Sequence, residues 1–340
     1  MVSMKDIAER CGVSVATVSK AMNNHSDISE DTKRNIRKIA EQMGYFPNSA
    51  ARALKTNRTY NIGVLYRDEA HNGLTHEYFA SILEGFKAEA ESRGYDLTFI
   101  NHNVGTNNMT YYEHCKYRGV DGVVMACIDF TAPEVVTLVN TSIPTVTIDH
   151  IYDNCSSVIS DNASGMKELT EYVYSLGHRK IAYIYGEAHS VVTKTRLNAF
   201  RRTLEELGVT IPDSYLMECD YRNAAVAAIR TRQLLRLKDR PTCILYPDDF
   251  TCIGGISEIR SQGMSVPDDI SVAGYDGGLV SEIIDPPLTT LKQNTTQIGK
   301  MAAIHLIDAI EHPGNPAENI PVKRSVVEGG LVKGRSAKRI

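Results

Sequence analysis

Adjacent carboxylates and paired histidines are the residues of this chain whose spacing comes nearest to catalytic chemistry. Asp248 and Asp249 form a carboxylate pair, but the side chains of consecutive residues usually splay apart instead of meeting at one substrate. His71 and His76 are five residues apart, whereas a helix that binds zinc places its two histidines four apart. The sequence contains no glycine-rich phosphate loop, nucleophile elbow or zinc-protease motif. We therefore expect a protein that is not an enzyme, with no catalytic residue, metal site or cofactor.

The cysteines and the amino-terminus predict the compartment. The 340-residue chain has seven cysteines and no Cys-x-x-Cys pair, and most of them stand in apolar runs such as VVMACI and PTCILY. Buried, reduced thiols are the expected state of such cysteines. The amino-terminus has no apolar signal-peptide core, and no stretch is apolar for long enough to span a bilayer. The sequence therefore predicts a cytoplasmic protein without a membrane partner.

The charge of the chain is unevenly distributed. The net charge is −4, which by itself argues against binding to nucleic acid. Residues 1–60, however, contain ten Lys and Arg against six Asp and Glu, whereas the remaining chain has eight more acids than bases. A basic segment joined to an acidic body indicates DNA binding at one end of the chain.

Residues 1–46 read as a headpiece of three short helices. Ser3, Ser14 and Ser29 are candidate N-caps, and Gly12 and Gly44 can adopt the positive φ that ends a helix. Two helices joined by a short turn that contains glycine are typical of a helix-turn-helix. Apolar residues at spacings of three and four predict its small core: Ile7, Ala8, Val13, Val18, Met22, Ile36, Ile39, Ala40 and Met43.

The second helix of a helix-turn-helix enters the major groove, and its first residues meet the base edges. Val15 and Ala16 can read only thymine methyl groups and groove shape, whereas Thr17 and Lys20 can bond base edges or phosphates. Ser14 and Ser19 are candidate phosphate contacts. The alternative is that Val15 and Ala16 belong to the core.

Residues 47–60 are predicted to form a hinge. Pro47 forces a break, and Asn48 can cap the short segment SAARALK, which is too short to be a stable helix alone in water. Leu54 is a large apolar residue among polar neighbours, which is unusual for an exposed linker. It either contacts a partner or covers the body that follows.

From residue 61 to 330, short apolar runs alternate with amphipathic helical stretches. This pattern predicts an α/β domain with doubly wound parallel sheets covered on both faces. The seven expected strands are IGVLY, YDLTFIN, DGVVMACI, PTVTID, KIAYIYG, PTCILYP and ISVAGYD. Seven strands exceed one such unit, so we expect two lobes with a ligand cleft where strand ends meet. The tail, residues 331–340, is basic and is expected to be disordered.

The segments MKDIAERCGVSVATVSKAMN, SEDTKRNIRKIAEQMGYFPNSAARALKTNRTYNIGV, GHRKIAYIYG, PTCILYPDD, ISVAGYD and PPLTTLKQ together resemble the lactose/galactose repressor family. The resemblance covers the chain to about Gly330. It implies a sequence-specific regulator, most often a repressor, with a periplasmic-binding-protein-like sensing domain. It also implies base readout by the second helix of the headpiece. In this family a leucine at the position of Leu54 wedges apart base pairs in the minor groove, so the resemblance assigns DNA contacts in the hinge to Asn48, Ala51, Leu54 and Lys55.

The same resemblance places a small effector between the two lobes. Carried over residue by residue, it assigns the effector site to Tyr78, Phe79, Asp149, Arg196, Tyr221, Asp248 and Asp276. Carboxylates, one arginine and aromatic faces suit a sugar, because the charged groups bond hydroxyls while a ring covers the apolar face. The same residues also allow purely structural interpretations, in which Asp276 is a turn residue, Arg196 is a surface charge and the aromatic residues belong to the core.

The loop RDEAHNGLTHEYF is about five residues longer than the usual family link and lacks its common proline, and Val192 replaces a frequent small hydroxyl residue. The effector is therefore not carried over from any relative. A purine-like ligand, a phosphorylated carrier-protein partner and a sugar-binding transport protein are the alternatives. Because the tail lacks heptads, we expect a homodimer formed by the body, through the helix that contains Ile82, Leu83 and Phe86 and the segment near Leu279 to Ile284.

Overall fold

The computed structural model describes residues 2–46, 53, 58–67, 73–104, 107–312 and 322–340. The chain forms two compact units, Met1–Thr59 and Tyr60–Ile340.

The first unit contains the three helices that the sequence predicts: α1 (Met4–Cys11), α2 (Val15–Met22) and α3 (Glu30–Gln42). Each begins after the expected serine, whose side chain accepts a hydrogen bond from a backbone N–H of the first turn. Gly12 has φ 66°, which allows the turn between α1 and α2. The predicted core is confirmed, with Ala21 as a further buried member.

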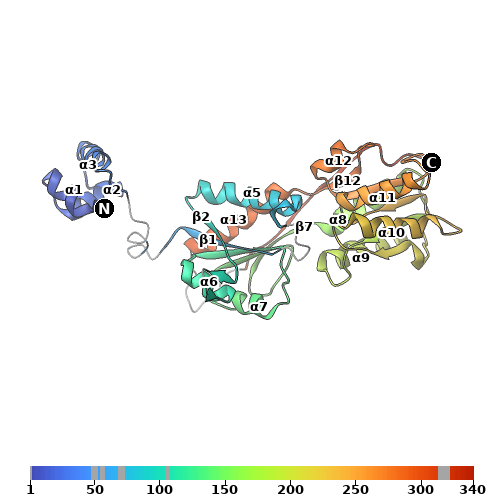
Figure 1. The fold of residues 1–340 in the computed structure, drawn as a ribbon, viewed down its shortest axis with the longest axis horizontal. Helices are drawn as coiled ribbons and strands as arrows, with labels where there is room; N and C mark the ends of the chain where they lie inside the picture. Colours follow the sequence, from blue (N-terminus) through green and yellow to red (C-terminus); the bar gives the residue numbers. More distant parts are fainter. Residues whose placement is uncertain (1, 47–52, 54–57, 68–72, 105–106, 313–321) are drawn as a thin grey trace. The chain divides into compact units, whose positions relative to one another are not determined.

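The amino-terminal lobe of the second unit has a six-stranded, fully parallel sheet in the order β13-β7-β6-β5-β1-β2. Its strands are β1 (Asn61–Tyr66), β2 (Asp96–Phe99), β5 (Gly122–Ala126), β6 (Thr145–Ile148), β7 (Ser156–Ser160) and β13 (Arg324–Val327). Helices α5 (Glu77–Ser92) and α13 (Thr295–Glu311) cover one face, and α6 (Tyr111–Arg118) and α7 (Pro133–Val139) cover the other (Figure 1). A short helix, η1 (Gly73–Thr75), precedes α5, and a hairpin of β3 (Asn103–Val104) and β4 (Asn107–Asn108) follows β2.

The carboxy-terminal lobe repeats this arrangement. Its sheet has the order β14-β12-β11-β10-β8-β9, and every pair is parallel except β14 with β12. The strands are β8 (Ile181–Tyr185), β9 (Leu216–Glu218), β10 (Cys243–Leu245), β11 (Ser271–Asp276), β12 (Thr289–Lys292) and β14 (Gly330–Val332). The helices are α8 (Asn162–Ser175), α9 (Val191–Glu206), α10 (Ala224–Leu235), α11 (Asp249–Ser261) and α12 (Leu279–Ile283), with η2 (Asp213–Tyr215) before β9. The predicted two-lobed, parallel α/β architecture is confirmed.

The chain crosses between the lobes in three places: between β7 and α8, between β12 and α13, and between β13 and β14. In both sheets the first strand in sequence lies inside and the second at the edge, so the order reverses beside the first strand. In sheets of this kind ligands bind at the carboxyl ends of the strands, next to that reversal.

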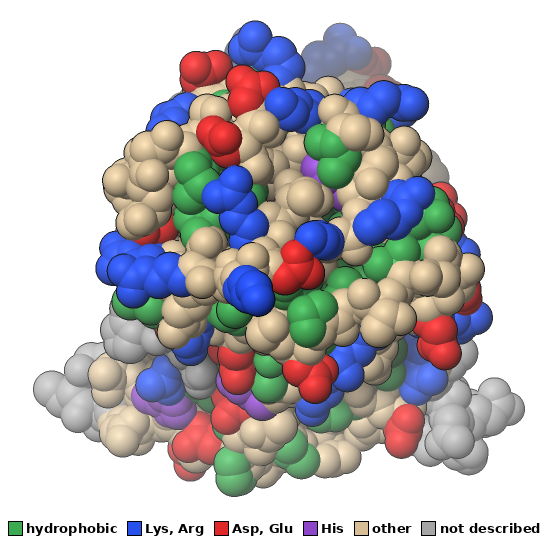
Figure 2. Space-filling model, turned by 90° about the vertical axis from the view of Figure 1, so that its right-hand side faces the viewer, with side chains coloured by type: hydrophobic (Ala, Val, Ile, Leu, Met, Phe, Trp, Pro, Cys, Tyr) green, Lys and Arg blue, Asp and Glu red, His purple; other side chains and the backbone are tan. Residues whose placement is uncertain are grey.

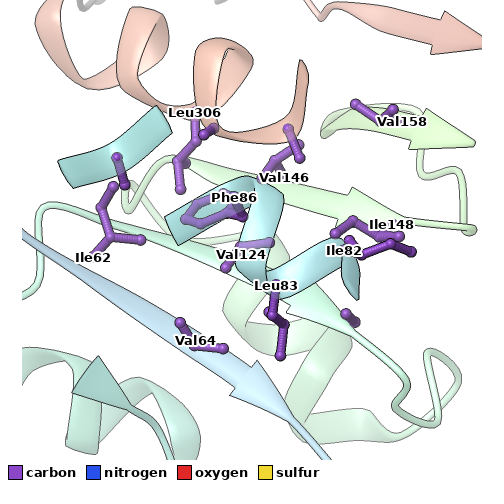
Figure 3. Packing of buried hydrophobic residues seen from close by; sticks show 14 of the residues in the cluster. Ile62, Val64, Ile82, Leu83, Phe86, Val124, Val146, Ile148, Val158 and Leu306 are labelled. Carbon is purple, nitrogen blue, oxygen red and sulfur yellow. The ribbon is translucent and has the colours of Figure 1, made fainter. Parts of the chain in front are cut away.

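The apolar face of α5, the helix expected to take part in the dimer, is buried within its own lobe. Ile82, Leu83 and Phe86 point toward the sheet and pack against β1, β5 and α13 in the core of their own lobe (Figure 3). A helix that covers a parallel sheet must bury its apolar face there, so that face is not free for a partner. Leu279 and Ile283 on α12, in contrast, are 62% and 72% exposed.

The expectation of a disordered tail is also wrong. Residues 330–332 form the edge strand β14, and Ser336 is completely buried. Its hydroxyl donates to Val272 O at 2.7 Å and accepts from Thr289 N at 2.8 Å. These bonds tie the tail to β11 and to the start of β12, so its basic charges do not keep it unfolded.

The end of the second unit formed by the carboxy-terminal lobe carries Lys and Arg interspersed with Asp and Glu (Figure 2). The coloured residues in that view form no continuous basic surface of the kind that follows a phosphate backbone. Of the seven free cysteines, Cys11 and Cys127 are half-buried and the others are buried. Within the described ranges, no helix is long and apolar enough to cross a membrane. The same residues contain no group of three or more His, Cys, Asp or Glu that could hold a metal ion.

Candidate functional site

The start of α2 presents the predicted DNA-reading residues to solvent. Ser14 Oγ accepts from Thr17 N at 3.0 Å and holds the first turn. Val15 is 45% exposed and Ala16 is exposed, so neither belongs to the core. The buried face of the helix is supplied by Val18 instead.

Lys20 lies one turn further along and forms an ion pair with Asp27 in the loop after α2. The bond to Lys20 lowers the pKa of the Asp27 carboxyl. Ser19 is half-buried, and its backbone carbonyl accepts from Asn23 Nδ2 at 2.7 Å. The structure thus groups Ser14, Val15, Ala16, Thr17, Ser19 and Lys20 on one short helix. The predicted hinge contacts Asn48, Ala51, Leu54 and Lys55 lie outside the described residues.

The second unit has a cavity of about 710 Å³ at the carboxyl ends of strands from both sheets. That volume is in the range of pockets that hold small molecules. Six of the seven predicted effector residues line it: Tyr78, Phe79, Asp149, Arg196, Tyr221 and Asp276.

Tyr78 and Asp149 form a hydrogen-bonded pair on the amino-terminal lobe. Tyr78 Oη donates to Asp149 Oδ2 at 2.7 Å, and Ser160 N donates to Asp149 Oδ1 at 3.3 Å. Burial raises the pKa of Asp149, although both hydrogen bonds act in the opposite direction. Asp149 stands directly after β6 with φ 58°, a backbone conformation that aspartate tolerates better than most residues.

Arg196 projects from α9 and is 3% exposed, so it is not a surface charge. Its Nε donates to Asn162 Oδ1 at 2.7 Å and its Nη1 donates to Pro247 O at 3.0 Å. The guanidinium carbon lies 3.6 Å from the centre of the Tyr275 ring. Burial disfavours the charge, yet the surrounding tyrosines and Asp276 raise the pKa of Arg196 above its usual value.

Asp276 ends β11 with φ 103° and accepts a hydrogen bond from Gln293 Nε2 at 2.6 Å. Burial raises the pKa of the Asp276 carboxyl to about 7, although Arg196 favours its ionised form. Gln293 is 4% exposed and lies where the chain leaves β12 for the other lobe.

On the opposite wall, the hydroxyl of Tyr221 lies 2.9 Å from Thr193 Oγ1. Glu187 Oε1 accepts from Tyr221 N at 3.3 Å. Burial raises the pKa of Tyr221 to about 12 and also raises that of Glu187. Tyr221 therefore enters the cavity as a neutral ring with a hydroxyl.

Asp248 does not line the cavity. Its carboxylate caps α11, accepting from Thr251 N at 2.7 Å, and it also accepts from Arg222 N at 2.8 Å. Each oxygen of the Asp248 carboxylate accepts a hydrogen bond from a backbone N–H, so Asp248 positions the loop that contains Arg222 and does not face a ligand. Asp249 turns the other way and accepts from Thr290 Oγ1 at 2.6 Å.

Several lining residues were missed in the sequence. Phe130 and His150 form a parallel stack with ring centres 4.3 Å apart, and Tyr152 Oη donates to Phe130 O. Gln293, Asp129 and Glu187 also line the cavity. Most of these follow the end of an apolar strand closely, which is the signal that could have identified them.

A contact between the lobes lies next to the cavity. Glu77, the first residue of α5, accepts a hydrogen bond from Leu279 N at 2.6 Å. Leu279 opens α12, whose N-cap Gly278 supplies no side chain. A carboxylate of one lobe therefore caps a helix of the other.

Residues 3–48 match the family model of bacterial regulatory proteins, lacI family, and residues 170–332 match the periplasmic binding protein-like domain. The HTH-type transcriptional repressor PurR of Glaesserella parasuis serovar 5 is 31% identical over 333 residues, which cover 96% of this chain and 95% of the relative.

Solved structures give the same result. The lac repressor dimer bound to operator and the anti-inducer ONPF has a TM-score of 0.80 and 25% identity, with 99% of each chain covered. The transcriptional regulator CelR in its cellobiose complex has the same fold, with a TM-score of 0.71, 23% identity, and 99% of this chain and 100% of that one covered.

A helix-turn-helix unit joined to an α/β unit with a ligand-sized cleft defines a DNA-binding transcription repressor that is controlled by an effector. The chain belongs to the lacI family of bacterial regulatory proteins.

Proposed function

We propose that this protein is a homodimeric repressor that acts in the cytoplasm and releases or binds its operator in response to a carbohydrate held in the cleft. The observation that carries the proposal is the cleft itself, where carboxyl groups, one buried guanidinium and aromatic rings meet at the strand ends of two lobes. No catalytic role is part of this proposal.

At the DNA end, we propose that Val15, Ala16, Thr17 and Lys20 read bases and that Ser14 and Ser19 contact phosphates. The exposure of Val15 and Ala16 at the start of α2 supports this assignment, because apolar residues without a core role are available to thymine methyl groups. A two-fold dimer that presents two such helices needs a pseudo-palindromic operator of roughly 14–20 base pairs.

For the hinge, we propose that Leu54 wedges the central base step, with Asn48, Ala51 and Lys55 contacting the backbone around it. The test compares Leu54→Ala with the unchanged protein on operator and on random DNA. Leu54→Ala should weaken operator binding and leave random-DNA binding nearly intact, because a wedge matters only where the DNA is kinked. Equal losses on both DNAs would reject this role.

A carbohydrate effector is supported by the arrangement of polar and aromatic groups. Asp149 and Asp276 offer acceptors from the two lobes, while Tyr221 and the stacked pair of Phe130 and His150 offer flat faces. Such a combination suits a ring that carries hydroxyl groups around its edge and C–H groups on its faces.

The test is a thermal-shift screen of the full chain, since a ligand that binds only the native state raises the melting temperature. Monosaccharides and disaccharides form one arm, and adenine, guanine and hypoxanthine form the other. The purine arm is needed because the matched relative is named PurR and because the Phe130–His150 stack also suits a planar base. Shifts confined to the bases would replace the carbohydrate with the purine-like alternative.

The homodimer is supported by the dimeric state of the lac repressor structure and by the exposed apolar side chains of Leu279 and Ile283 on α12. Light scattering should give about twice the chain mass of 37.6 kDa at micromolar concentration. Leu279→Glu should shift the mass toward that of one chain. A monomer that binds operator at full affinity would contradict the proposal.

A further inference from the structure

The groups that line the cleft carry more negative than positive charge. The described lining contains four carboxyl groups and two guanidinium groups and no lysine, namely Asp129, Asp149, Glu187, Asp276, Arg196 and Arg222. Hydrogen bonds from Thr131 lower the pKa of Asp129, which keeps that carboxyl ionised. Burial raises the pKa of the other three, because a carboxylate that loses its hydration is less stable in its charged form, and a buried phosphate or carboxylate of a ligand meets the same cost. Of the three histidines in the lining, His150 is kept neutral because burial lowers its pKa.

Neither guanidinium presents its full set of donors to an incoming anion. Nε and Nη1 of Arg196 already donate to Asn162 and to the carbonyl of Pro247, so the fork of donors that grips an oxyanion is partly used. Arg222 lies over the ring of Phe250, with its guanidinium carbon 4.8 Å from the ring centre.

Among the described residues of the lining, Gln293 Oε1 and Arg222 Nε are buried without a hydrogen-bond partner, and the two atoms differ in kind. Gln293 Oε1 is an acceptor and lies on a residue whose amide nitrogen holds Asp276, whereas Arg222 Nε is a donor. A ligand that satisfies both must donate at one point and accept at another. Hydroxyl groups do both and so suit these two atoms, whereas an added phosphate or carboxylate at neutral pH brings only further acceptors and negative charge.

We infer that the cleft selects an effector without phosphate or carboxylate groups, namely a polyhydroxylated molecule that is neutral or carries an amino group. This inference rests on the proposed carbohydrate effector and narrows it. Such a cleft would bind the free sugar in preference to its phosphorylated form, although both present the same ring and the two share their remaining hydroxyl groups.

The experiment measures binding of matched pairs to the full-length chain by thermal shift and by titration calorimetry. The probes are glucose with glucose 6-phosphate and with gluconate, fructose with fructose 6-phosphate, ribose with ribose 5-phosphate, and glucosamine. At least one neutral or amino member should bind, and its phosphorylated partner should bind about tenfold more weakly or worse because of repulsion from the cleft carboxylates.

A variant separates charge from shape. Glu187→Gln keeps the acceptor for Tyr221 N and removes one cleft charge. It should therefore reduce the ratio between the dissociation constants of the phosphorylated and the free sugar. Asp213→Asn, on the exposed helix η2, changes the net charge equally outside the cleft lining and should leave the ratio unchanged.

A phosphorylated sugar that binds as tightly as its free partner would overturn the inference and leave the carbohydrate effector standing. An unchanged ratio in Glu187→Gln would overturn it as well. Absence of binding by every sugar, in either form, would overturn the carbohydrate effector and the inference together.

Discussion

Replacing Asp276 with asparagine should stabilise the native protein while removing its response to effector. Burial raises the pKa of Asp276 to about 7, from an ordinary value of 3.8. The native state therefore holds a proton that the unfolded chain has released, and this contribution to stability disappears as the pH rises through 7. At pH 8 the ionised carboxylate is buried at a cost of about 4 kcal/mol, at 1.36 kcal/mol for each pH unit between the two values.

Asparagine avoids this cost. It has nearly the same shape, tolerates a positive φ, and its side-chain oxygen can still accept from Gln293 Nε2. The Asp276→Asn variant should therefore be more stable at pH 8 by up to about 4 kcal/mol. At pH 5 the native carboxyl is already protonated, so the advantage should fall to about 2 kcal/mol. The effector response should be lost at pH 8, because the ionised Asp276 acceptor is then gone from the cleft.

Urea denaturation of the variant and of the unchanged protein at pH 8 and at pH 5 measures the difference in their free energies of unfolding. Tyrosine fluorescence reports on the unfolding, since the chain has 17 tyrosines and no tryptophan. A difference in the free energy of unfolding that stays constant between the two pH values would show that burying the charge of Asp276 does not destabilise the native state. A variant that is less stable at both pH values would show the same.

Three further sets of changes test other parts of the molecule. Lys20→Ala should weaken operator binding by about 1–3 kcal/mol if Lys20 bonds a base edge. Asp27→Asn should strengthen operator binding in gel-shift titrations, because it releases Lys20 from its ion pair. Tighter binding by Lys20→Ala and weaker binding by Asp27→Asn would show that Lys20 does not contact the operator. Glu77→Ala should make the Leu279 amide exchange faster with deuterium, because the interlobe cap is lost; unchanged exchange would mean that the cap is not held in solution. Ser336→Val leaves a buried donor and a buried acceptor unpaired and should cost about 1–3 kcal/mol in urea denaturation; no loss would mean that the tail is not docked.

Long apolar strands and capped helices could be predicted from the sequence because their signals are local. The three serine caps of the first unit and the apolar strand β5 are examples, and both are confirmed. Strands β7, with the sequence SSVIS, and β12, with TTLK, were missed because they carry hydroxyl residues instead of an apolar run. Pairing with the neighbouring strands of the sheet imposes the extended conformation on these segments, and the pattern of their own residues does not predict it.

The cleft shows the same limit. Asp248 and Asp276 both follow an apolar strand, so the sequence treats them alike. In the fold, Asp248 turns into the N-terminus of α11, whereas Asp276 turns into the cavity. Which way a strand-end carboxylate turns depends on which backbone donors are near it, and that is a property of the folded chain. The tail was misjudged for a related reason, since its charges are visible in the sequence but the partners of Ser336 are not.

The three crossings between the lobes have a consequence for how such proteins can be recombined. Neither lobe is one continuous stretch, because α13 and β13 return to the amino-terminal lobe before β14 closes the other sheet. A single splice that exchanges everything after β7 would thus transplant one whole lobe and also a helix and an edge strand of the other. Grafting one lobe onto a relative takes three junctions, at 161, 293–294 and 328–329. Gln293, which bonds Asp276 in the cleft, stands on the second junction, so the choice of parent there also decides part of the effector contact.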